Sequence, residues 1–284
     1  MDVGVIFPGL IRTLDPTRIV DWAQASEDLG FSTFAVTDRP SWTTPDPLTT
    51  LSAAAAVTRR IRLMTSILQA PLRSNPVLFA NQVSAVDGIA GAGRLTIGLS
   101  PGGRETDYEG SGVDFHRRGA IFDQWLTQYR AAMDGAYGPA PVTVGGPPLL
   151  FGGFVPAAIR RVVTVGAGWI GAHSEPEKLA PFLDGIREAR AAADKSAPRF
   201  VVCQSISLDP QPADPAAGLA GVEAYYSDLG PQFAGFAVAG TLTSPELLRE
   251  RIEGWSAVGV DELLLAVNDP DPAGLTRIRA ELSN

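Results

Sequence analysis

A short apolar run followed by a helical stretch occurs eight times along this chain, and this alternation limits the folds that the chain can adopt. The apolar runs are mostly continuous, as expected of strands that are covered on both faces. Strands that alternate with helices indicate a parallel sheet with crossover helices. Eight such units in 284 residues favour a closed (β/α)8 barrel, the TIM-barrel fold, over an open sheet. We expect the strands at 3–7, 33–37, 61–65, 95–99, 149–151, 168–170, 200–207 and 262–267.

Several helix starts are marked by an acceptor side chain followed by proline, as in Asp15-Pro16, Asp46-Pro47 and Asn75-Pro76. No linker or repeat divides the chain, so we expect one α/β domain over residues 1–284. The irregular stretches 100–113 and 209–239 are predicted to be loop insertions at the C-terminal face of the barrel. Helices are predicted at 15–29, 47–58, 76–89, 117–133, from 156, and at 176–193, 219–229, 245–258 and the C-terminus.

Charge and cysteine content exclude several classes of function. The net charge of −8 argues against a general binder of nucleic acid or of an anionic membrane. No apolar run is long enough to span a membrane, and the first residues resemble a strand rather than a signal peptide. The single cysteine, Cys203, lies in an apolar run and is predicted to be a buried, inert thiol. We therefore expect a cytoplasmic protein, and two distant histidines with one cysteine predict no metal site.

The barrel fold predicts where the chemistry lies, because the active site of such barrels is built from the loops after the strands. This rule selects candidate residues after five of the strands. They are Asp38 and Arg39, then Thr65, Ser66 and Ile67, then Ser100, then Gly152, Gly153 and Phe154, and finally His173.

Two glycine pairs among these loops are each open to two interpretations. Gly152-Gly153 precedes a helix that carries Arg160 and Arg161, so it is either a phosphate cradle at a helix N-terminus or a tight turn. Gly102-Gly103 precedes Arg104 and belongs either to a mobile lid with an arginine for an anion or to a flexible loop.

The polar and aromatic candidates are also each open to more than one interpretation. Asp38 either orients a cofactor or acts as a base, or else it caps the next segment or pairs with Arg39. His173 is either a proton donor or a residue that precedes a helix capped by Ser174. His116 lies at a basic helix start that is either solvated or in contact with a cofactor. The rings of Trp42 and Trp169 belong either to a pocket wall or to the core.

Ordered blocks along nearly the whole chain resemble the luciferase-like monooxygenase superfamily, in particular its deazaflavin-dependent branch. No single block is specific to this family, but the occurrence of all the blocks in the same order along the chain is. The blocks are residues 29–38, 46–51, 60–66, 75–82, 93–99, 145–153 and 259–265.

This resemblance implies a flavin-type ring at the C-terminal mouth of the barrel and often a homodimer. Asp38 matches the family's acidic residue at the tip of the second strand. Ser66 and Ile67 match a bulge in the third strand, where a non-prolyl cis peptide often backs the deazaflavin ring. The turn 152–154 matches the phosphate side of the cofactor site. The family commonly has histidine where this chain has Arg39, which stays protonated and is a poor general base.

The resemblance implies an oxidoreductase that uses the deazaflavin coenzyme F-420 (F420) to transfer a hydride to or from a small organic substrate. The alternatives are a monooxygenase that uses reduced FMN and a non-catalytic flavin-binding relative. Asp38, Arg39 and His173 are the candidate catalytic residues. The candidate cofactor-binding residues are Asp38, Thr65, Ser66, Ile67, Ser100, Gly152, Gly153 and Phe154. A second departure from the family follows the fourth strand, where many deazaflavin enzymes carry a polar residue and this chain has Ser100-Pro101, so the resemblance does not identify the hydrogen-bond partner of the ring.

Overall fold

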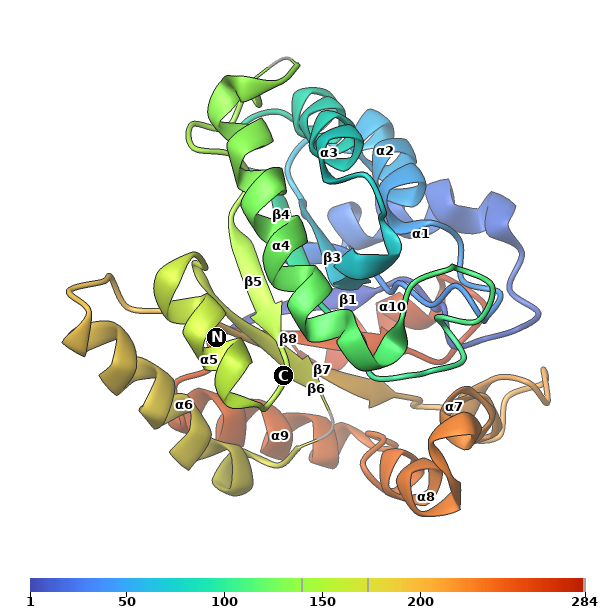
Figure 1. Ribbon diagram of the computed structural model, residues 1–284. Helices are drawn as coiled ribbons and strands as arrows, with labels where there is room; N and C mark the ends of the chain where they lie inside the picture. The colour runs from blue at the N-terminus through green and yellow to red at the C-terminus, as the bar shows by residue number, and fades with distance from the viewer. Residues whose placement is uncertain (139, 173, 283–284) are drawn as a thin grey trace.

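The eight apolar runs form parallel strands that close into one barrel in the computed structural model (Figure 1), and the predicted fold class is confirmed. The structure describes residues 1–138, 140–172 and 174–282. Each strand pairs with the next along the chain, and β8 pairs with β1. The strands are β1 (Asp2–Ile6), β2 (Thr33–Val36), β3 (Arg62–Gln69), β4 (Leu95–Ser100), β5 (Leu149–Gly152), β6 (Gly168–Ala172), β7 (Arg199–Ile206) and β8 (Glu262–Val267).

Alternate side chains of the strands supply two separate apolar clusters. One fills the inside of the barrel and includes Ile6, Met64, Ile170 and Leu264. The other is much larger and lies between the barrel and its surrounding helices. Because both faces of each strand are buried in this way, the strand sequences are continuously apolar. None of the helices that the structure describes is long and apolar enough to cross a membrane.

The helices begin mostly where the capping signals predict. Asp46 accepts a hydrogen bond from the Thr49 N–H, and Asn75 accepts one from the Leu78 N–H, both at 2.9 Å. Asp15 caps only a short 3-10 turn that precedes the first helix. The described helices are α1 (Ile19–Asp28), α2 (Pro47–Val57), α3 (Pro76–Ala90), α4 (Arg118–Ala131), α5 (Pro156–Thr164), α6 (Pro176–Ala192), α7 (Gly218–Tyr226), α8 (Pro231–Ala239), α9 (Pro245–Ala257) and α10 (Gly274–Glu281).

Two features differ from the sequence-based expectation. Strand β3 continues to Gln69, four residues past its predicted end, because its pairing with β4 resumes after a register shift between Thr65 and Leu68. Helix α8 was not predicted. It begins at Pro231, in the segment taken to be irregular, and buries Ala234 and Ala237. The α7–α8 pair lies beyond the C-terminal end of β7 (Figure 1), so this insertion reaches the mouth of the barrel.

A buried carboxylate joins the strands at the opposite, N-terminal end of the barrel. Glu262 is fully buried and accepts hydrogen bonds from the hydroxyls of Ser32 and Thr33. It also pairs with Arg62, at 3.0 Å, and with Arg199. These partners come from β2, β3, β7 and the residue before β2. A single side chain on β8 therefore ties several strands together where the barrel closes.

Candidate active site

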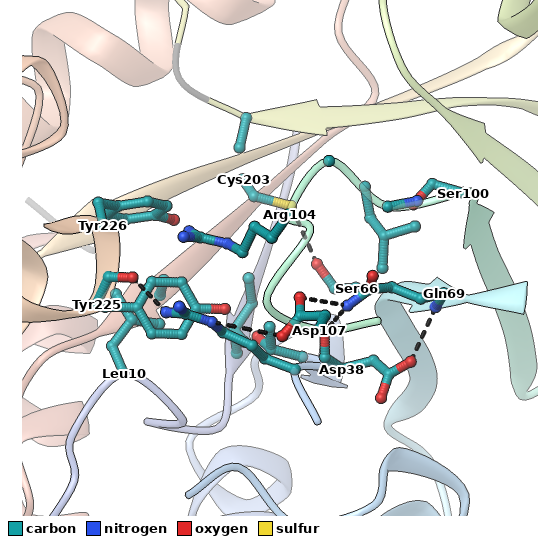
Figure 2. A pocket seen from close by; sticks show the side chains of 18 of the residues that line it. Leu10, Asp38, Ser66, Gln69, Ser100, Arg104, Asp107, Cys203, Tyr225 and Tyr226 are labelled. Carbon is teal, nitrogen blue, oxygen red and sulfur yellow. Dashed lines mark hydrogen bonds and ion pairs between the residues drawn. The ribbon is translucent and has the colours of Figure 1, made fainter. Parts of the chain in front are cut away.

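A cavity of about 190 Å³ lies at the C-terminal ends of the strands. Pockets that hold drug-sized ligands usually measure roughly 300–1,000 Å³, so this cavity is small for a cofactor and a substrate together. Its lining residues are Ile6, Leu10, Thr37, Asp38, Arg39, Ser66, Ile67, Gln69, Ser100, Gly102, Gly103, Arg104, Asp107, Ala172, Cys203, Ser205, Tyr225, Tyr226 and Ala266. Figure 2 shows their side chains gathered from opposite sides of the mouth.

Five of the predicted site residues meet in this cavity. They are Asp38 and Arg39 after β2, Ser66 and Ile67 in β3, and Ser100 at the end of β4. Strands that neighbour one another in a parallel barrel end at the same rim, which brings these distant positions together.

Thr65 and His173, which were also predicted as site residues, are not among these five. Thr65 is fully buried, and its hydroxyl donates to the Gly98 carbonyl at 2.9 Å instead of lining the cavity. His173 lies outside the described residues. Helix α6 has Glu175 rather than Ser174 at its N-cap, so the predicted cap is wrong.

The bulge that the family resemblance implies in β3 is present. The Ser66–Ile67 peptide bond is cis, and the register of β3 against β4 shifts here. The Ser66 hydroxyl lies 3.1 Å from the Cys203 sulfur. Burial raises the pKa of the Cys203 thiol to about 12, so the thiol stays protonated, in agreement with the predicted inert cysteine.

Asp38 is a buried carboxylate with two partners from β3 and the residues after it. One oxygen accepts from the Gln69 N–H at 2.8 Å, and the other accepts from the Arg73 guanidinium at 2.9 Å. The pairing of Asp38 with Arg39 that the sequence left open is therefore wrong. Burial raises the pKa of Asp38 to about 6, although the Arg73 charge and the Gln69 N–H oppose this shift. Near pH 6 the carboxyl group is populated in both protonation states.

Arg39 is also buried, and its guanidinium binds the α7 region. It donates to the Tyr225 carbonyl, and to the Asp228 carboxylate at 2.7 Å. The Asp107 carboxylate lies 3.8 Å from its Nε atom. The guanidinium also lies 4.5 Å from the Tyr225 ring centroid, within range of a cation–π interaction. Arg39 thus connects the end of β2 to α7 across the rim.

Arg104 closes the mouth from the opposite side. It pairs with Asp228 and lies 5.0 Å from the ring centroids of both Tyr225 and Tyr226 (Figure 2). Thr106 donates to the same carboxylate at 3.0 Å. These contacts hold the loop after β4 against the end of α7.

The sequence-based reasoning missed several residues of this site, among them Gln69, Asp107 and the two tyrosines. Gln69 donates to Asp107 at 2.7 Å, and Asp107 also accepts from the Ser41 N–H at 3.2 Å. Of these residues, Gln69 could have been predicted from the sequence, because a polar residue directly after the apolar run of β3 indicates a position at the mouth of the barrel. Asp107 lies in an irregular loop, where no periodicity predicts its direction.

The Gly152–Phe154 turn lies beside the cavity but is not part of its lining. A Cβ atom on Gly152 would come within 2.9 Å of Ile67 and 3.4 Å of Ser100, both of which line the cavity. Gly153 has a φ of +112°, and its carbonyl accepts from the Trp169 indole at 2.9 Å. The Phe154 ring packs on Trp169 and is half exposed.

The arginines and the remaining aromatic candidates lie elsewhere. Arg161 binds Asp123 of α4 at 2.7 Å, and Arg160 lies 4.0 Å from the same carboxylate. The two arginines after the glycine pair are therefore held by α4. The His116 side chain is 80% exposed and does not line the cavity. Trp169 is buried in the core, whereas Trp42 packs against Tyr225, behind the cavity wall.

Comparison with known proteins places these features in context. A family model described as luciferase-like monooxygenase matches residues 1–232. An uncharacterized protein of Mycobacterium tuberculosis is 27% identical over 232 residues, which cover 69% of this chain and 78% of that protein. The F420-dependent glucose-6-phosphate dehydrogenase of Mycobacterium tuberculosis is 29% identical over 224 residues, which cover 69% of this chain and 66% of the enzyme.

Solved structures share the fold over nearly the whole chain. The monooxygenase RslO1 from Streptomyces bottropensis superposes with a TM-score of 0.79 at 20% identity and covers 99% of this chain and 98% of its own. An F420-dependent secondary alcohol dehydrogenase superposes with a TM-score of 0.78 at 16% identity, and the match covers 98% of this chain and 97% of that enzyme. A third structure is the oxygenating constituent of 3,6-diketocamphane monooxygenase from Pseudomonas putida in complex with FMN. Its TM-score is 0.77 at 17% identity, and the match covers 100% of this chain and 97% of that protein.

Proposed function

Because this chain belongs to the luciferase-like monooxygenase family, we propose that it is an oxidoreductase that uses F420 to transfer a hydride to or from a small organic substrate. The observation that carries the proposal is the meeting of Asp38, Ser66, Ile67 and Ser100 in one cavity at the barrel mouth. The family resemblance places the cofactor ring against Ser66 and Ile67 and matches Asp38 to the family's acidic residue at the tip of the second strand. The 29% identity to an F420-dependent dehydrogenase supports the choice of cofactor.

The residues around the cavity fit a flat ring. Ile67 offers an apolar surface, and Gly152 leaves room for its side chain, since a Cβ on Gly152 would lie 2.9 Å from the Ile67 Cδ1 atom. The tyrosine rings of α7 and the hydroxyls of Ser66 and Ser100 complete a lining that is apolar with a few polar groups. This mixture is typical of sites that hold cofactors.

When bound, F420 would supply the ring carbon that accepts or donates the hydride. Asp38 would hold or release a proton beside the ring, because its pKa of about 6 lets it do both near neutral pH. Arg39 keeps its charge, and since it binds Tyr225 and Asp228, we assign it to holding α7 at the mouth rather than to proton transfer. Gly153 and the uncapped N-terminus of α5 would hold the phosphate.

A monooxygenase that uses reduced FMN is the second candidate function. The likeness in fold to the FMN-bound 3,6-diketocamphane enzyme supports it, since both chains are matched over nearly their full length. Both functions place a tricyclic ring in the same cavity and differ in whether the ring reacts with oxygen.

Titration of the purified protein with F420, FMN and NADPH tests the proposal. We expect F420 to bind with quenching of its fluorescence, and we expect no oxygen consumption, because a deazaflavin reacts poorly with oxygen. Binding of FMN alone, together with oxygen uptake that requires a flavin reductase, would instead support the monooxygenase. A protein that binds neither ring in either redox state would refute both functions.

We also propose that the protein forms a homodimer through α2 and α3, which pack side by side (Figure 1). Neither helix has an exposed charged side chain, since the one charged residue, Asp87, is buried. Leu78 and Ile89 on α3 are more than half exposed. Sedimentation should give a mass near twice 29.9 kDa, and a glutamate in place of Ala85 should lower it. A wild-type mass of one chain would contradict the proposal.

A further inference from the structure

The side-chain amide of Gln69 has one orientation that its neighbours allow. Its nitrogen lies 2.7 Å from an oxygen of Asp107 and 3.3 Å from the Asp38 carbonyl. Carboxylate and carbonyl oxygens accept hydrogen bonds but donate none. The NH₂ group must therefore face these two oxygens, and the amide oxygen Oε1 must face the other way.

Oε1 of Gln69 has no donor among the described residues, although the side chain is only 5% exposed. A buried acceptor without a donor costs about 1–3 kcal/mol, and native proteins leave few such atoms. Gln204 on β7 is a useful contrast. It is equally buried, but its nitrogen donates to the Gly240 carbonyl and its oxygen accepts from the Trp255 indole. The free acceptor of Gln69 is thus a feature of this site and not of buried glutamine in this barrel.

Gly102 packs directly against this amide. A Cβ atom on Gly102 would lie 2.1 Å from Oε1 and 2.8 Å from Cδ of Gln69, so any side chain there would push the amide out of its position. Gly102 and Gln69 both line the cavity. The side chain that carries the unpartnered acceptor therefore lines the same cavity as Ile67.

We propose that Oε1 of Gln69 accepts a hydrogen bond from the imide N–H of the bound cofactor ring, the N–H that lies between the two carbonyl groups of its pyrimidine part. This assignment rests on the proposed function. Both FMN and F420 carry this group, and in the oxidised ring of FMN it is the sole N–H donor. Gln69 follows Ile67 by two residues on β3, so the acceptor lies beside the surface on which the ring would pack. Asp107 then acts as a positioning residue that fixes the direction of the amide.

Replacing Gln69 with leucine tests the assignment through cofactor affinity, measured by fluorescence titration with F420 and with FMN. We expect the Kd of the cofactor that binds to rise about tenfold, the loss of one well-placed hydrogen bond. Gln204→Leu is the matched control. It removes a buried glutamine from the same barrel outside this cavity and should leave the Kd within about twofold of wild type.

A second variant reaches the same oxygen from the loop. Gly102→Ala should weaken binding by at least as much as Gln69→Leu, because its methyl group would overlap the Gln69 amide and displace Oε1. Gly110→Ala is its control, since Gly110 has a similar φ of +74° but open space around it. A cofactor analogue methylated at the imide nitrogen should bind wild-type protein about tenfold more weakly than the parent and bind Gln69→Leu with no such difference.

Folded Gln69→Leu protein with a wild-type Kd would overturn the assignment, and so would wild-type protein that binds the methylated analogue as tightly as the parent. Either result leaves the proposed function intact. Wild-type protein that binds neither F420 nor FMN would refute the proposed function and this assignment with it.

Discussion

Replacing Gly153 with aspartate should abolish the binding of F420 and FMN in a protein that still folds. Gly153 directly follows β5 and precedes α5, whose N-terminus has no side-chain cap. Free N–H groups at a helix N-terminus attract a phosphate, and a carboxylate placed there would repel it. Two like charges about 4 Å apart in partly screened surroundings repel by about 4 kcal/mol, roughly a thousandfold in affinity.

Gly153→Ala separates this charge effect from backbone strain. Both variants share the φ of +112°, which side chains rarely adopt, so both should lose some stability. The alanine Cβ would lie 3.5 Å from Ala158, an ordinary contact, and most of the affinity should remain. Fluorescence titration measures binding, and thermal unfolding reports the fold. If Gly153→Asp binds the cofactor as wild type does, the phosphate lies elsewhere.

Replacing Glu262 with alanine should destabilise the barrel by about 3 kcal/mol. Removing one partner of a buried ion pair typically costs about 3–5 kcal/mol, because the remaining groups lose their partners. We expect the lower end of this range. Arg62 keeps Asp2 as a partner, and the Arg62 and Arg199 side chains are 34% and 28% exposed, so water can solvate them. Urea unfolding with circular dichroism at pH 7 measures the change in the free energy of unfolding.

Glu246→Ala serves as the control for this measurement. Glu246 also pairs with an arginine, Arg249, at 3.3 Å, but it lies on the surface of α9 with a side chain that is 75% exposed. Exposed ion pairs contribute little to stability, so the midpoint of unfolding should barely change. Equal effects of the two substitutions would show that the network at the N-terminal end of the barrel does not hold the strands together.

Much of the fold and part of the site could be predicted from local patterns. The strands were found within a few residues of their observed bounds, apart from the end of β3, because burial on both faces leaves a continuous apolar run in the sequence. One rule, that the strands of a barrel end at a common rim, was enough to predict four residues of the mouth: Asp38, Ser66, Ile67 and Ser100.

The residues that were missed depend on partners that are far away in the sequence. Gln69 becomes a fixed acceptor because Asp107, 38 positions later, binds its amide nitrogen. Arg39 could be read as a catalytic candidate from its place after β2, yet its contact with Asp228 spans 189 positions. Nothing near either residue in the sequence indicates these partners, and α8, which also went unpredicted, lies in the same insertion as Asp228.

The barrel, and the end of it at which the predicted site residues meet, follow from local sequence patterns, because apolar periodicity and capping act over a few residues. Which polar groups bind one another at that end depends on the packing of distant segments. Asp38 is bound by Arg73 and not by Arg39, and Arg104 reaches across to Asp228. A hydrogen bond or ion pair depends on distances of a few ångströms between side chains, and those distances are set when the loops pack over the closed barrel.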